Sequence, residues 1–160
     1  MNVALHWDRG QNFLVAWGRI IPCSCKVRNI YNGLRPVNQI VYSIPHNKPY
    51  QPEVFPPGVW QIGYPKPRTD CYRKPWFIPT NAARMAKVWE TIAGEYVRAT
   101  DELTIDEDYG LHASASPTTL GCIRIDTVSD VLWMAEQIKR EYNNGILYFE
   151  VTEHDKRANL

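Results

Sequence analysis

The chain has 160 residues, which is enough for one domain with one substantial hydrophobic core. Hydrophobic residues make up 44% of it and the formal net charge is +1, which excludes the composition of a disordered chain and disfavours a nucleic-acid binder with a basic patch. No stretch is long and apolar enough to span a membrane. The N-terminus lacks the pattern of a secretory signal peptide, so we expect synthesis in the cytoplasm without one.

The first half of the chain has the pattern of short strands and turns. Residues 3–7 and 12–17 are β-prone and flank a turn-rich segment, which predicts a hairpin. Further strands are expected at residues 39–44 and 59–64. Prolines are frequent between positions 45 and 79, and they favour loops and edge strands over helix in that region.

Two amphipathic helices are predicted in the second half. The first begins at Thr80 or Asn81 and ends near Gly94, because Ala82, Met85, Val88, Trp89 and Ile92 recur at helical spacing. The second has Thr127 as N-cap with Asp130 three residues later, and ends at residues 144–145. Its expected buried stripe is Val128, Val131, Leu132, Ala135, Ile138 and Tyr142.

A final strand is expected at residues 146–152, so the elements together predict a β-rich α+β fold in a single domain over residues 1–160.

The segment from Tyr109 to Arg124 contains the candidate catalytic residues. Cys122 is a candidate nucleophile, and His112 is a base suited to deprotonate it. Gly121 allows backbone N–H groups to approach an oxyanion, and Arg124 can hold a carboxylate. The alternative is structural: His112 ends a strand, Cys122 is a small buried residue, and Arg124 forms a surface ion pair with Asp126 or Asp130.

This segment resembles the YkuD-type L,D-transpeptidase catalytic domain. That family has Ser/Thr-His-Gly-Cys followed by an apolar residue and Asn or Arg, and this chain has Thr119-Leu120-Gly121-Cys122-Ile123-Arg124, in which Leu120 replaces the second histidine. The run Pro56-Pro57-Gly58-Val59-Trp60-Gln61-Ile62 also fits, and the resemblance covers about residues 40–152. His112 precedes Cys122 by ten residues, a short spacing similar to that of compact interbacterial effectors and phage-borne forms.

The resemblance implies a YkuD-like β-sandwich or barrel-like core with two helices. It also implies that Cys122 attacks a carbonyl of a peptidoglycan stem peptide while His112, oriented by the Ala113 carbonyl, acts as base and acid. The N–H groups of Gly121 and Cys122 would stabilise the oxyanion, and Arg124 would bind a substrate carboxylate. The expected substrate-binding residues are Arg124, Thr119, Ser114 and Tyr109. For the last three, a purely structural role in the loop or the core is the alternative.

No cofactor or metal is expected. Cys23-Ser24-Cys25 resembles half of a metal site, but no second close pair completes it. A disulfide from Cys71 to Cys23 or Cys25 is left open.

Three functions remain on these residues: hydrolysis of peptidoglycan by a toxin or lysin, transfer that forms cross-links or exchanges D-amino acids, and a non-catalytic wall-binding or virion-structural module. Peptidoglycan stem peptides are the expected partner, together with an immunity protein or delivery partner if the protein is an effector. Action is then expected in the periplasm or cell wall after delivery or lysis.

Overall fold

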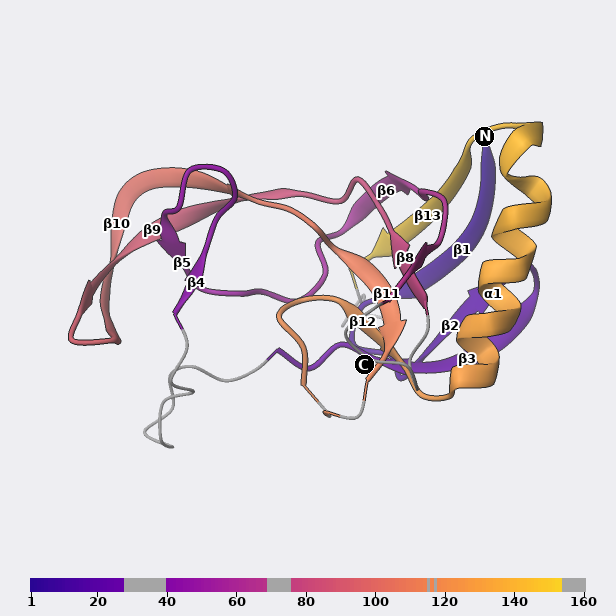
Figure 1. Cartoon of the computed structure of the whole chain (residues 1–160), viewed down its shortest axis with the longest axis horizontal. Coiled ribbons are helices and arrows are strands. Elements are labelled where there is room, and N and C mark those ends of the chain that lie inside the picture. Colours follow the sequence, from indigo (N-terminus) through magenta and orange to yellow (C-terminus); the bar gives the residue numbers. More distant parts are fainter. Residues whose placement is uncertain (28–39, 69–75, 115, 117, 154–160) are drawn as a thin grey trace, which may run out of the picture.

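The computed structural model describes residues 1–27, 40–68, 76–114, 116 and 118–153 (Figure 1). Its main feature is a nine-stranded mixed sheet with the order β6-β13-β1-β2-β3-β12-β11-β8-β7. The strands of this sheet are β1 (Asn2–Asp8), β2 (Phe13–Ala16), β3 (Arg19–Ser24), β6 (Gly58–Gln61), β7 (Lys66–Pro67), β8 (Trp76–Pro79), β11 (Gly110–Ala113), β12 (Ile123–Ile125) and β13 (Leu147–Thr152). With the helix α1 (Val128–Glu141), they confirm the predicted β-rich α+β class.

The predicted strands fall largely where the sequence pattern puts them. The hairpin β1–β2 is antiparallel, and β13 lies parallel to β1. The strand expected at residues 59–64 is β6, after which Ile62 forms a single bridge with Thr80. The strand expected at residues 39–44 is only β4 (Val41–Tyr42), which pairs with β5 (Pro49–Tyr50), and residue 39 lies outside the described residues.

The helix predicted from Thr80 to Gly94 is wrong. The chain there forms β9 (Arg84–Ile92), which pairs with β10 (Glu95–Asp106) in an antiparallel hairpin that we call the arm. Ala86 and Val88 are buried while their neighbours are more exposed, which is the alternation of a strand. Ala93 and Gly94 have φ of 52° and 79°, as a two-residue hairpin turn with both φ positive requires, so Gly94 turns the chain rather than ending a helix.

The second predicted helix is confirmed as α1. The Thr127 side chain accepts a hydrogen bond from the Asp130 N–H at 3.2 Å, so the cap forms as predicted. Its buried face is Asp130, Val131, Met134, Ala135 and Ile138. Leu132 and Tyr142, which were predicted to be buried, are each 41% exposed, and Tyr142 packs edge-on against Tyr64 instead. None of the helices formed by the described residues is long and apolar enough for a membrane span.

Strands β11 and β12 are interior strands of the sheet and pack against the hydrophobic core. Strand β12 lies between β3 and β11, and α1 contacts β8, β11 and β12. The largest fully buried side chains come from these and neighbouring elements: Trp7, Phe55, Phe149, Leu5, Leu14, Ile21, Ile78, Leu111, Ile123, Ile125, Met134 and Ile138. The arm projects away from the sheet on the side opposite α1 (Figure 1). The candidate site lies at the ends of β11 and β12, where the chain leaves this core.

Candidate active site

Strands β11 and β12 bring His112 and Arg124 to one face of the sheet, and Cys122 directly precedes β12. The two strands are parallel, with His112 opposite Arg124. Leu111, Ala113, Ile123 and Ile125 are buried, so His112 and Arg124 point to the other face because side chains alternate along a strand. Cys122 directly precedes β12 and lies two residues from Arg124, and its Sγ is next to the Asp108 carbonyl.

The turn that carries Cys122 is closed by Thr119. The Thr119 hydroxyl donates to the Cys122 carbonyl at 2.7 Å, and the Gly121 N–H donates to Thr119 Oγ1 at 3.2 Å. Thr119 is buried, so it positions the turn. The Gly121 N–H, which was expected to bind an oxyanion, donates within the turn in this conformation, and this leaves the Cys122 N–H as the donor to consider.

A second thiol, that of Cys25, contacts the same turn. Cys25 Sγ donates to the carbonyls of Gly121 and Cys122 at 3.2 and 3.5 Å and accepts from the Phe55 N–H at 3.5 Å. Burial raises the pKa of Cys25 to about 11, so it is a neutral thiol able to donate at neutral pH. The sequence offered only its closeness to Cys23, which suggested a metal site and gave no hint of this contact.

Cys122 is half-buried, and its Sγ lies 3.8 Å from the Asp108 carbonyl oxygen. Burial raises the pKa of Cys122 to about 11; the Gly110 N–H and the Arg68 guanidinium oppose this rise, and the Asp106 and Asp108 carboxylates add to it. At neutral pH the resting group is therefore a thiol. It needs a base to react as a nucleophile.

The His112 imidazole is held by the backbone beside it. Its Nδ1 lies 2.9 Å from the Ala113 carbonyl oxygen, the contact that the family resemblance implies for an orienting group. With a proton on Nδ1 donated to that carbonyl, Nε2 keeps a lone pair and can accept a proton. Arg68 Nη1 donates to the same carbonyl at 3.0 Å. It also lies 3.2 Å from Nδ1, and because arginine can only donate, this contact is a hydrogen bond only in the other tautomer, with the proton on Nε2. Arg68 lies in the proline-rich region with no motif around it, so no pattern in the sequence pointed to it.

Arg124 is engaged by the protein itself. Its Nε donates to the Ser114 carbonyl at 3.0 Å and its Nη1 lies 3.3 Å from Asp126 Oδ1. The surface ion pair weighed as the alternative is therefore present with Asp126, whereas Asp130 pairs with Arg19 at 3.4 Å. Ser114 contributes its carbonyl to Arg124 and its hydroxyl to the Ser116 N–H, so both contacts lie within the protein.

Tyr109 forms the inner wall of the site. Its ring is buried against Phe55, and its hydroxyl donates to the buried Asp106 carboxylate, to which Arg84 Nε also donates at 2.8 Å. Burial and the Asp106 carboxylate raise the pKa of Tyr109 above its usual range, so the phenol stays neutral. This network fixes the start of β11 and, with it, His112.

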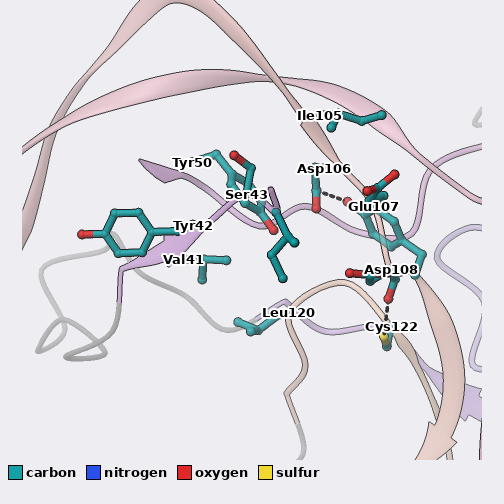
Figure 2. A pocket seen from close by; sticks show the side chains of 12 residues that line it. Val41, Tyr42, Ser43, Tyr50, Ile105, Asp106, Glu107, Asp108, Leu120 and Cys122 are labelled. Atoms are coloured by element: carbon teal, nitrogen blue, oxygen red, sulfur yellow. Dashed lines mark hydrogen bonds between the residues drawn. The ribbon is translucent and has the colours of Figure 1, made fainter. Parts of the chain in front are cut away.

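A pocket of about 280 Å³ opens beside Cys122 (Figure 2). Tyr109, Leu120 and Cys122 line one end of the pocket. The remaining walls come from β4, β5, the end of β10 and the residues that follow these strands. Leu120, at the position of the family's second histidine, is 40% exposed. The exposed carboxylates of Glu107 and Asp108 also line the pocket, so its charge is negative near Cys122.

Cys23, Cys25 and Cys122 are free thiols, and Cys71 lies outside the described residues. No protein-family model, curated protein or solved structure matches this chain.

The core thiol of Cys23 should make stability fall at alkaline pH. Burial raises its pKa from 9.0 to about 12, with Asp126 as the next cause, so the folded state holds a proton that the unfolded state loses above about pH 9. The contribution is complete below that pH and is lost as pH rises towards 12. We expect a loss of about 1.4 kcal/mol per pH unit above pH 9 from this thiol.

Urea unfolding at several pH values from about 8 to about 10.5 tests this expectation. The decline with pH should be shallower in Cys23→Ala, whereas Ile21→Val, a change of another buried residue on β3 that does not titrate, should keep the wild-type decline. Parallel pH curves for wild type and Cys23→Ala would contradict the prediction.

Proposed function

We propose that the protein is a cysteine-dependent acyl-transfer enzyme that hydrolyses peptidoglycan stem peptides in the manner of an L,D-carboxypeptidase or endopeptidase. The observation that supports this proposal is the parallel pairing of β11 and β12, which sets His112 opposite Arg124, two residues after Cys122 at the edge of a pocket. A thiol, an oriented imidazole and an adjacent cavity are the parts that acyl transfer requires. The motif around Cys122 supplies the substrate class.

In the proposed reaction, His112 Nε2 takes the proton of the Cys122 thiol as the sulfur attacks the carbonyl carbon of the stem peptide. The tetrahedral oxyanion accepts a hydrogen bond from the Cys122 N–H, and such a donor contributes about 3–4 kcal/mol in other enzymes. The C–N bond then breaks, and the imidazolium gives its proton to the departing amine. A thioester on Cys122 remains. His112 deprotonates a water that attacks the thioester carbonyl carbon, the C–S bond breaks to release the acid, and the imidazolium returns the proton to the Cys122 sulfur.

Transfer to an amine is a second candidate for the same thioester. The observation that favours it is the pair of exposed carboxylates, Glu107 and Asp108, because they would attract the ammonium group of an acceptor to the pocket beside Cys122. A wall-binding module without catalysis is the third candidate. It is favoured by the raised pKa of Cys122 and by the contact of its sulfur with the Asp108 carbonyl.

Mass spectrometry of muropeptides incubated with the protein separates the three. Loss of one alanine from a tetrapeptide muropeptide marks carboxypeptidase activity, and conversion of dimers to monomers marks endopeptidase activity. New dimers or a D-amino-acid adduct mark transfer. Cys122→Ala is the matched control and should leave every muropeptide unchanged. If the wild-type protein also leaves every muropeptide unchanged, the enzymatic proposal is wrong.

A further inference from the structure

Arg68 reaches the candidate site from the edge of the sheet. It directly follows β7, the last strand in the sheet order, and β8 separates β7 from β11. Two strand spacings are about 10 Å, a distance that an arginine and a histidine side chain can span together. Arg68 is half-buried and its guanidinium ends beside His112, 44 positions further along the chain. The sheet topology therefore brings this cation to the candidate base.

Arg68 and His112 share one hydrogen-bond acceptor. The Ala113 carbonyl oxygen lies 3.0 Å from Arg68 Nη1 and 2.9 Å from His112 Nδ1. A carbonyl oxygen has two lone pairs, so it can accept from both N–H groups at once. Two N–H groups that converge on one oxygen lie close together, which accounts for the 3.2 Å between Nη1 and Nδ1. With the Nδ1 proton in this place, Nε2 is left to accept the proton of Cys122.

This carbonyl lies where the pairing of β11 with β8 stops. Within the described residues, the ladder between the two strands ends at the pair of His112 and Phe77, whose rings are 6.0 Å apart between centroids. Ala113 is the next residue along β11, and Arg68 supplies a donor to its carbonyl. The guanidinium therefore extends the support of β11 by one residue, at the group that orients the imidazole.

The charge of Arg68 also acts on Cys122. Arginine stays protonated at any pH at which the protein is folded, and here it lowers the pKa of the Cys122 thiol. The Asp106 carboxylate at the end of β10 and the Asp108 carboxylate after it act in the opposite direction, as does burial. The thiol of Cys25 lies nearby and is neutral at pH 7. Arg68 thus opposes two carboxylates that disfavour the thiolate.

We propose that Arg68 is a positioning residue for the reaction: its guanidinium fixes the Ala113 carbonyl that orients the His112 imidazole, and its charge stabilises the Cys122 thiolate. This inference rests on the proposed function. Arg68 takes no proton in the reaction and acts only through the base and the nucleophile. Its replacement should therefore lower kcat and leave KM nearly unchanged.

Kinetics on a tetrapeptide muropeptide test the positioning. In Arg68→Gln, kcat is expected to fall about 10–100-fold with KM within about twofold, because a misplaced imidazole slows proton transfer without weakening substrate binding. Lys66→Gln is the matched control, since Lys66 is exposed on β7, two residues before Arg68, and its loss removes the same charge. It should keep the wild-type kcat and KM.

Alkylation of Cys122 by iodoacetamide tests the effect of the charge without any substrate. Mass spectrometry of the peptide that contains Cys122 separates it from the other thiols. Between pH 7 and 9, Arg68→Gln should react about threefold more slowly than wild type, because a higher pKa lowers the thiolate fraction more than it raises the nucleophilicity of the thiolate. Arg68→Lys keeps the charge and should restore the wild-type rate, which a purely structural loss would not allow.

The two measurements separate this inference from the proposed function. Cleavage of the muropeptide with wild-type kcat and alkylation in Arg68→Gln overturns the inference and leaves the proposed function standing. Equally slow alkylation in Arg68→Gln and Arg68→Lys shows a structural loss and also overturns it. If the wild-type protein cleaves no muropeptide, the proposed function is wrong, and slow alkylation in Arg68→Gln that Arg68→Lys restores still supports the action of Arg68 on Cys122.

Discussion

Replacing His112 by glutamine is expected to slow hydrolysis of a tetrapeptide muropeptide by about 10²–10⁴-fold at neutral pH. Glutamine keeps a polar side chain next to the Ala113 carbonyl but has no atom that can take the Cys122 proton. With the pKa of Cys122 near 11, about one sulfur in 10⁴ is a thiolate at pH 7 without a base. The rate is expected to fall to the level that this small fraction sustains.

The pH dependence of the residual rate distinguishes a lost base from a damaged fold. In His112→Gln the rate should rise about tenfold per pH unit from pH 7 to 9, because the thiolate fraction rises as pH approaches the pKa of Cys122. The wild-type rate should depend less on pH over this range. Circular dichroism melting of both proteins checks the fold. A variant that is stable and as active as wild type would exclude His112 as the base.

How much of the fold could be predicted depends on how local its determinants are. The helix α1 was found because its cap and its apolar spacing lie within one short segment. The arm was missed because Met85, Val88 and Ile92 recur at helical spacing although the chain there is a strand, and such short apolar patterns do not decide the element. What decides is the pairing of β9 with β10 and the turn at Ala93 and Gly94, which required both φ values to be positive.

The candidate site shows the same limit. Cys122, Gly121 and His112 lie in one short segment with a recognisable pattern, so sequence reasoning could reach them. Cys25 and Arg68 reach the same place from distant parts of the chain, through hydrogen bonds to the Gly121 and Ala113 carbonyls. No pattern in a single sequence indicates such contacts. The hydrogen bond from Arg124 to the Ser114 carbonyl likewise joins residues on either side of the loop between β11 and β12, whereas the ion pair of Arg124 with Asp126, two residues away, was among the alternatives drawn from the sequence.

Replacing Gly121 by alanine is expected to destabilise the protein by about 3 kcal/mol and to lower its activity on muropeptides more than tenfold. Gly121 has φ of +124°, a conformation that residues with a Cβ rarely adopt. A Cβ there would lie 2.6 Å from the Glu53 carbonyl oxygen and 2.6 Å from Tyr109 Cε1, and neither the backbone nor a buried ring can easily move away. The turn that presents Cys122 would have to shift.

Gly18→Ala is the matched control for this prediction, because Gly18 also has a positive φ, +78°, but nothing lies within 4 Å of the added Cβ. It should cost only the backbone term, about 1 kcal/mol, and leave activity unchanged. Urea unfolding measures both free energies. The rates of muropeptide hydrolysis are measured without denaturant, at a temperature where both variants are folded. The excess cost at Gly121 then reports the packing of Glu53 and Tyr109 against the turn. Equal losses of stability in the two variants would show that this packing does not hold Cys122 in place.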